Sequence, residues 1–226
     1  MTSVNWKGLP LAIFGSGGIS KETYNLIKHI NSKSYQSVYD FIGFIESDKS
    51  SIGKVVIDGY TVVTCDESIF EFADKYPTIG MVIPVGNPII KEKIFRRIQN
   101  IPNVVFPNII YPSIEMDSES IKLGFGNVIT AGVNLTCDIK IGNFNLINLN
   151  STIGHDTTIG DFNVVNPLVA ISGEVRIGNA CLIGTGAKIL QQLLINDNCT
   201  VGAGSVVTKN TEPNSTIVGM PARRVK

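Results

Sequence analysis

One histidine and the acid that follows it are the residues of this chain best suited to proton-transfer chemistry. His155 and Asp156 lie in the stretch LNSTIGHDTTIGDF, residues 149–162, and the chain holds only one other histidine. An imidazole has an ordinary pKa of about 6.5, so it can accept a proton near neutral pH. A neighbouring carboxylate can fix its tautomer and favour the imidazolium that forms. The pair therefore predicts a general base that deprotonates an attacking amine or hydroxyl.

The residues around His155 belong to a six-residue repeat. Every sixth residue from Leu123 to Val207 is aliphatic, fifteen positions in all, and the residue four places after each is uncharged. The next residue is most often Gly or Asn, which we expect to supply the positive φ of a tight corner. An amphipathic helix would need a period of 3.6 residues, so this period instead predicts short strands that turn corners and stack coil on coil.

The repeat resembles that of known β-helices, in which three six-residue units complete one coil. This resemblance implies five coils for the fifteen units, or a prism of ~24 Å at the strand spacing of parallel sheets. His155 comes two residues after the inward Ile153, so its ring should point away from the prism. The four cysteines show no C-x-x-C spacing and are predicted to be reduced packing residues. Among them Cys181 and Cys199, one coil apart, should stack in the core.

The N-terminal half alternates apolar strands with helices. LPLAIFGSGGISKETYNLIKHI reads as a buried strand, a glycine turn and a helix from about Lys21, and TIGMVIPVGNPIIKEKIFRRIQN repeats this order. Between them, YDFIGFIESD reads as a strand that ends in acids. This order predicts a small parallel α/β unit with its ligand at the C-terminal edge of the strands, where helix N-termini attract phosphate. We expect two domains, residues 1–108 and 109–226.

Composition narrows the class of protein. The 19 basic and 19 acidic side chains cancel, which argues against nucleic acid or an anionic membrane surface as a partner. The first residues carry one lysine and an apolar run too short to span a bilayer, with no signal-like cleavage site, so a cytoplasmic protein is expected.

From about Leu123 to Val207 the chain resembles the left-handed parallel β-helix of the hexapeptide acyltransferases. The two-part layout, a Rossmann-like domain followed by this all-β helix, resembles the sialic-acid O-acetyltransferase-like sugar acyltransferases over nearly the whole chain. The best-understood relatives are nucleotide-linked 4-amino-sugar N-acetyltransferases. The motifs that carry the resemblance are FGSGG, VGNP, IGHDTTIGDF and the ending IVGMPARRVK.

The resemblance implies an N-acetyltransferase that uses acetyl-CoA and acts on a nucleotide-linked amino sugar in bacterial surface glycan biosynthesis. It implies a homotrimer in which acetyl-CoA lies along the β-helix between neighbouring subunits. It also makes His155 the catalytic base and Asp156 the acid that follows it. Val164 stands where some relatives carry a histidine that touches the cofactor, so that contact should be absent or apolar.

Binding residues follow from the same resemblance. Those implied to hold the nucleotide-linked sugar are Gly17, Gly18, Ile19, Glu46, Ser47 and Gly86, with Asn148 holding either the acceptor or the base; a role for Asn148 in forming a corner is equally open. Ser47 replaces the second of two acids that meet uridine in relatives, so the nucleotide's base stays open. Those implied to meet the pantetheine arm of acetyl-CoA are Gly173, Thr185 and Ala203.

Three other functions stay open at this point. A sugar hydroxyl, including one of sialic acid, would use the same base as an amine. Left-handed β-helices also host zinc carbonic anhydrases with three histidine ligands, but this repeat holds one histidine, so we expect no metal. A sugar-binding or assembly module without catalysis is the third alternative, and the outward His-Asp pair argues against it.

Overall fold

The computed structural model describes residues 6–226, which divide into two compact units. The first unit runs to Val85 and resumes with Lys93–Pro112, and the second comprises Gly86–Glu92 and Ser113–Lys226. The domain boundary predicted after residue 108 lies four residues before Pro112. None of the helices described in these residues is long and apolar enough to cross a membrane.

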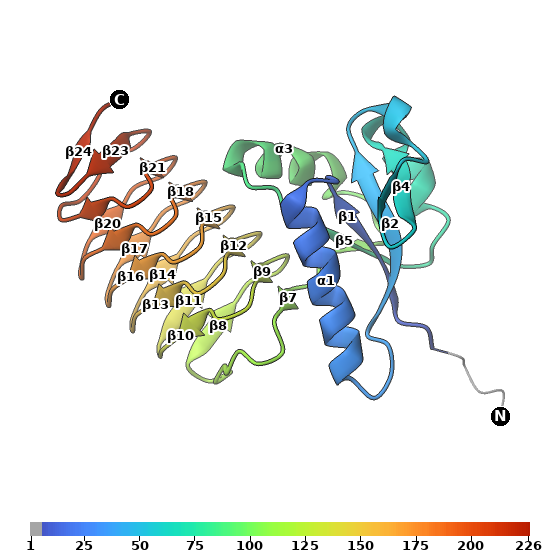
Figure 1. Cartoon of the computed structure of the whole chain (residues 1–226), viewed down its shortest axis with the longest axis horizontal. Helices are drawn as coiled ribbons and strands as arrows, with labels where there is room; N and C mark the ends of the chain where they lie inside the picture. The colour runs from blue at the N-terminus through green and yellow to red at the C-terminus, as the bar shows by residue number, and fades with distance from the viewer. Residues whose placement is uncertain (1–5) are drawn as a thin grey trace. The chain divides into compact units, whose positions relative to one another are not determined.

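The first unit is built on one sheet with the strand order β3-β4-β2-β1-β5-β6, of which Figure 1 labels β4, β2, β1 and β5. Neighbouring strands pair in parallel except β3 and β4, which are antiparallel. This is the Rossmann-like α/β unit that the sequence predicted. Its elements are β1 Leu9–Phe14, α1 Gly18–Lys33, β2 Tyr39–Glu46, η1 Lys49–Ser51, β3 Val55–Ile57, β4 Tyr60–Cys65, η2 Asp66–Ser68, α2 Ile69–Ala73, β5 Ile79–Val82, α3 Pro88–Ile98 (shared with the second unit), β6 Val104–Val105 and β7 Ile109–Ile110.

The glycine turn after β1 leads directly into α1. Leu11, Ala12 and Ile13 of this central strand are fully buried, as the unbroken apolar run requires. Helix α1 begins at Gly18, so the predicted start near Lys21 was wrong by about one turn. Gly17 precedes the helix in extended backbone without a capping side chain, and Gly18 already has helical backbone. The first turn tolerates glycine because its N–H groups have no partner inside the helix in any case.

The second unit is the predicted left-handed β-helix. Strands eighteen residues apart pair in parallel, as Thr152 does with Ala170, and build two sheets of order β10-β13-β16-β19-β22 and β20-β17-β14-β11-β8. In the third sheet the strands of this unit have the order β24-β23-β21-β18-β15-β12-β9, and the last pair, β23 and β24, is antiparallel. The strands are β8 Ile121–Leu123, β9 Val128–Ile129, β10 Asn134–Leu135, β11 Ile139–Ile141, β12 Leu146–Ile147, β13 Thr152–Ile153, β14 Thr158–Ile159, β15 Val164–Val165, β16 Ala170–Ile171, β17 Arg176–Ile177, β18 Leu182–Ile183, β19 Lys188–Ile189, β20 Leu194–Ile195, β21 Thr200–Val201, β22 Val206–Val207, β23 Thr216–Gly219 and β24 Ala222–Arg224.

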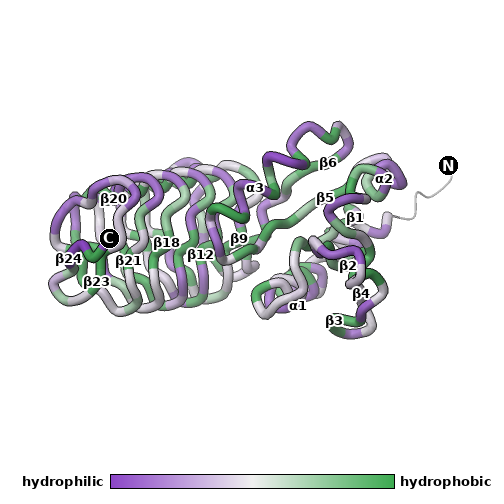
Figure 2. Tube along the Cα trace, turned by 90° about the horizontal axis from the view of Figure 1, so that it is seen from above, coloured by the Kyte–Doolittle hydropathy of each residue, from purple (hydrophilic) through white to green (hydrophobic). Residues whose placement is uncertain are grey.

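The core of the β-helix is formed by the repeated aliphatic residues. All fifteen predicted positions are buried except Leu123, which is half-buried on the first coil. The residues four places later are buried as well, Thr157, Cys181 and Cys199 fully, with the exception of the half-buried Leu193. Apolar and polar residues consequently alternate along every coil, as the hydropathy colouring shows (Figure 2). Each fully buried aliphatic side chain contributes about 1.5–3 kcal/mol, which is what stabilises coils with so few residues per strand.

The glycines of the repeat have a different purpose from the one predicted. Positive φ occurs three places after the aliphatic residue, for example at Asp156 (58°) and Glu174 (60°), and not at the glycines one place after it. A Cβ on Gly154 would lie 2.6 Å from the backbone nitrogen of Gly173 in the next coil. At residue 154 glycine is therefore required by the approach of the next coil and not by its φ, although the neighbouring coils carry Thr136 and Ser172 at the same register.

Candidate active site

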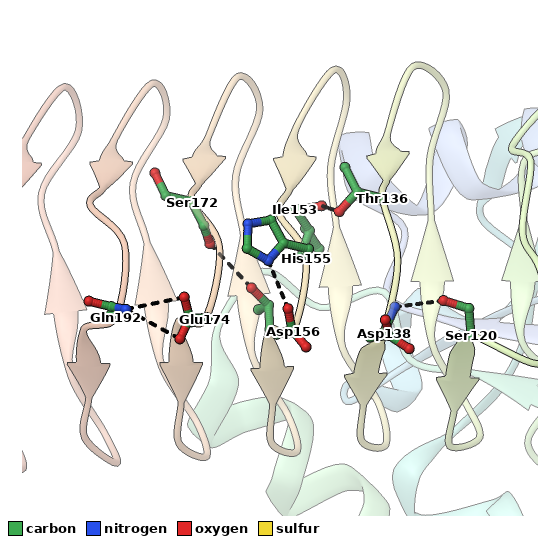
Figure 3. Close-up of polar contacts among 10 residues, drawn as sticks. Ser120, Thr136, Asp138, Ile153, His155, Asp156, Ser172, Glu174 and Gln192 are labelled. Atoms are coloured by element: carbon green, nitrogen blue, oxygen red, sulfur yellow. Dashed lines mark hydrogen bonds and ion pairs between the residues drawn. The ribbon is translucent and has the colours of Figure 1, made fainter.

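His155 and Asp156 form a dyad on the outside of the β-helix. They lie on the corner between β13 and β14, and their side chains are 56% and 58% exposed. His155 Nδ1 lies 2.8 Å from Asp156 Oδ2, so the short aspartate side chain reaches the ring (Figure 3). Asp156 N donates to Cys137 O of the preceding coil, which fixes the corner. With Nδ1 held by the carboxylate, Nε2 is the ring nitrogen placed to accept a proton.

Gly173, one coil after His155, gives the imidazole ring its space. A Cβ on Gly173 would lie 2.4 Å from His155 Nε2 and 2.6 Å from Cε1. The backbone φ of Gly173 is not positive, so the conformation itself does not require glycine. The other coils carry side chains at the same register position, namely Cys137, Gln191 and Lys209. The ring of His155 therefore accounts for the missing side chain at residue 173.

A polar hollow adjoins the dyad. It has a volume of about 650 Å³ and is lined by Asp156, Glu174, Arg176, Gln192, Leu193 and Leu194. Gln192 Nε2 donates to both carboxylate oxygens of Glu174, at 3.2 and 3.3 Å, and so fixes the second acid (Figure 3). Two carboxylates against one guanidinium make the wall beside the base favourable for a cationic group.

The cysteines divide into three buried thiols and one exposed thiol. Cys65, Cys181 and Cys199 are buried as predicted, and burial raises the pKa of Cys181 to about 12. Cys137 is exposed, so its prediction as a packing residue was wrong. Cys137 lies two places after the inward Leu135, the same outward register as His155. Its exposure could therefore have been predicted from the repeat.

The residues implied to bind the nucleotide-linked sugar in the first unit gather at one edge of its sheet. β1 and β2 pair from Leu9 to Phe14, so the turn after β1 and the end of β2 lie next to each other. Ser16 Oγ donates to Glu46 Oε1 at 2.5 Å, and Gly15 N donates to Ile45 O at 2.7 Å. The space a Cβ would occupy on Gly17 or Gly18 is open; Ile19 is half-buried behind them, and Ser47 is exposed.

Gly86 lies exposed in the turn before α3. Asn87 caps this helix, because its Oδ1 accepts from Ile89 N and Ile90 N at 3.0 and 3.2 Å. Proline at the first helical position completes the start signal. The sequence VGNP is thus the N-terminus of a helix whose first turn leaves Gly86 accessible.

The structure separates the remaining predicted residues from the dyad. Asn148 is nearly buried on the corner before β13; its Oδ1 accepts from Thr130 Oγ1 and Leu149 N, so it supports its own corner. Thr185 lies next to Ala203, since Gly204 N donates to Thr185 O, at the corner between β18 and β19. Only Gly173 of the three residues implied to meet acetyl-CoA touches the dyad. Val164 is fully buried, so it offers no outward contact.

Comparison with known proteins gives a match to each part of the chain. Residues 10–98 match the PglD N-terminal domain, and residues 174–209 match the bacterial transferase hexapeptide family. No curated protein sequence matches. Among solved structures, a variant of perosamine N-acetyltransferase from Caulobacter crescentus in complex with CoA and GDP-perosamine is 22% identical, with a TM-score of 0.85 over 96% of this chain and 97% of that one.

Two further solved structures cover both parts of the chain. The acetyltransferase domain of PglB from Neisseria gonorrhoeae in complex with acetyl coenzyme A is 24% identical, with a TM-score of 0.81 over 96% of this chain and 100% of that one. WeeI from Acinetobacter baumannii is 26% identical, with a TM-score of 0.80 over 96% and 100%. The two-unit architecture of this chain therefore recurs in all three proteins.

Proposed function

We propose that this chain, a hexapeptide-repeat acyltransferase with a PglD-type N-terminal domain, transfers an acetyl group from acetyl-CoA to the amine of a nucleotide-linked amino-deoxy sugar. The observation that carries the proposal is the outward dyad, in which Asp156 holds His155 Nδ1 at 2.8 Å and Gly173 leaves room for the ring. The solved structures of similar fold that hold CoA with GDP-perosamine, or acetyl coenzyme A, support this choice of substrates.

The reaction needs a base at the acceptor nitrogen. The sugar ammonium first releases a proton to water. Its neutral amine then attacks the thioester carbonyl, and His155 Nε2 takes one of the two amine protons as the N–C bond forms, while the other stays on the amide nitrogen. The C–S bond then breaks, and the imidazolium returns that proton to the leaving thiolate, giving the amide and free CoA. Asp156 stabilises the imidazolium between these steps. A positioned base of this kind typically contributes about 10²–10⁴-fold in rate.

An amine fits the site better than a hydroxyl. The carboxylates of Asp156 and Glu174 line the hollow beside the base, and an amino sugar arrives as an ammonium ion that such groups attract. A neutral hydroxyl of sialic acid would gain nothing from this charge. This favours N-acetylation over O-acetylation.

The nucleotide end of the acceptor belongs, in this proposal, at the edge of the α/β sheet. Gly17 directly precedes α1, and Gly18 and Ile19 are its first two residues. At this helix N-terminus, backbone N–H groups and the helix dipole favour a diphosphate. Glu46 shapes this turn through Ser16, while Ser47 and Gly86 are exposed and available to the ligand.

For acetyl-CoA we propose contacts along the corners of the β-helix. Gly173 lies beside the dyad, and the small residues Thr185 and Ala203 leave backbone groups accessible to the amides of the pantetheine arm. Because the dyad is more than half exposed, we propose that a homotrimer supplies the second wall of the site, which sedimentation of the purified protein measures. A cytoplasmic location is part of this proposal, since both proposed substrates are cytoplasmic metabolites.

Thiol release is the test of this function. Purified protein is incubated with acetyl-CoA and, separately, UDP-, dTDP- and GDP-linked amino sugars, the matching sugars with a hydroxyl in place of the amine, and sialic acid. Release with an amino sugar and none with its hydroxyl counterpart is the expected result. Thiol release with sialic acid alone would replace this proposal by O-acetylation. If none of the acceptors leads to thiol release, the proposal is wrong.

A further inference from the structure

The least expected group in the second unit is a lysine buried against the β-helix. Lys91 lies on α3, within the segment Gly86–Glu92 that groups with the β-helix, and only 1% of it is exposed. Its Nζ donates to Phe144 O at 2.9 Å and to Asn163 O at 3.4 Å. Burying an ammonium is costly unless it gains compensating hydrogen bonds, so this contact must hold the segment in place.

The two acceptors belong to successive coils at the corner between the β14 sheet and the β15 sheet. In the ladder between coils Phe162 N donates to Asn143 O and Leu146 N donates to Asn163 O, so Asn163 O accepts from the ladder and from Lys91 alike. Lys91 therefore adds a bond from outside the repeat, which joins α3 to two coils at once.

One of these coils also carries the dyad. His155 lies on the corner before β14, and Asn163 lies on the corner after it. The imidazole and the carbonyl that accepts from Lys91 are therefore separated by one short strand of the same coil. Asn87 caps α3, and Gly86 directly precedes this cap. The buried side chain of Lys91 thus links the part of the VGNP turn that belongs to the second unit, residues 86–88, to the coil that presents the base.

We propose that Lys91 is a positioning residue, which fixes the VGNP turn on the β14 coil so that the acceptor sugar is held at a set distance from His155. The inference rests on the proposed function, in which Gly86 contacts the acceptor. Burial lowers the pKa of Lys91 to about 7, and both the ammonium and the neutral amine keep enough N–H groups for two carbonyls. The link therefore holds on both sides of neutral pH.

The test replaces Lys91 by methionine, which keeps the length of the side chain but removes its donors. Lys91→Gln keeps a donor without charge, and Lys93→Met makes the same change at an exposed position of α3 as a control. We expect Lys91→Met to raise the KM for the acceptor sugar at least ~10-fold, with kcat and the KM for acetyl-CoA changed less than twofold, and Lys91→Gln to lie between it and the wild type.

Hydrogen exchange of the peptide covering residues 86–92 gives a readout that needs no activity. We expect Lys91→Met to speed its exchange while peptides of the β-helix core stay protected and Lys93→Met has no effect. Unchanged exchange would overturn the proposal, as would faster exchange with an unchanged KM for the acceptor. If even the wild type transfers no acetyl group, the proposed function fails, and the exchange data alone then decide whether Lys91 fixes the turn.

Discussion

At the scale of single residues, the dyad requires that residue 173, which faces the ring of His155, has no side chain. The imidazole of His155 lies over Gly173, and a side chain at residue 173 would collide with the ring. His155 was predictable because the repeat assigns each position a direction, and the second place after an aliphatic residue points outward. The role of Gly173 in making room for the ring was not predictable, since it depends on the contact between two coils and not on either sequence segment alone.

We predict that Gly173→Ala lowers kcat about 10- to 100-fold without unfolding the protein, because the new Cβ displaces Nε2 from its place. Gln191→Ala is the matched control, since residue 191 occupies the same register one coil later. Steady-state kinetics and thermal melts of both variants check this. A raised KM for acetyl-CoA with normal kcat would show instead that Gly173 serves the thioester and not the ring.

At the scale of elements, the six-residue repeat predicted the β-helix almost completely. Inward aliphatic residues, uncharged residues four places on and five coils all follow from steric rules that recur in each coil. For the glycines directly after the aliphatic residues, positive φ was the wrong explanation. At Gly154 the cause is the close approach of the next coil, which the sequence of a single turn does not reveal. The Ser16–Glu46 bond and the start of α1 were also missed, since side-chain partners across a sheet depend on register.

The outward register of Cys137 gives a prediction at this scale. One thiol of the native protein should react rapidly with a maleimide, because Cys137 is exposed while Cys65, Cys181 and Cys199 are buried. Since residue 137 lies one coil before His155, a bulky adduct there should also slow acetyl transfer. Mass spectrometry and activity after labelling measure both effects, and Cys137→Ser should abolish them. Labelling of two or more thiols in the folded protein would contradict the assignment.

At the scale of the whole molecule, two units each bring a different part of the proposed chemistry. The α/β unit supplies a helix start for phosphates, and the β-helix supplies a rigid corner for the base. Lys91 could not be foreseen, because the stretch IIKEKIF does not distinguish a buried lysine from an exposed one. Of the two lysines in this stretch, Lys91 is the one that the structure shows donating to backbone carbonyls.

Burial of Lys91 makes stability depend on pH. In the folded chain its pKa falls from 10.5 to about 7, so between these values the unfolded state binds more protons and the unfolding free energy rises with pH. Below pH 7 both states carry the proton and the full cost of burial applies. We predict that Lys91→Met is at least as stable as the wild type at pH 6. Above pH 7 the unfolding free energy of the wild type should rise relative to that of the variant by up to about 1.4 kcal/mol per pH unit. Urea unfolding at pH 6, 7.5 and 9 measures this, and parallel curves for the two proteins would contradict it.

The most direct measurement is kcat of His155→Ala with saturating acetyl-CoA and the best acceptor of the panel, with Asp156→Asn beside it. We predict a loss of at least ~100-fold for His155→Ala, a smaller loss for Asp156→Asn, and unchanged melting temperatures, because both side chains lie outside the core. A His155→Ala enzyme that turns over within twofold of the wild type would contradict the assignment of the base.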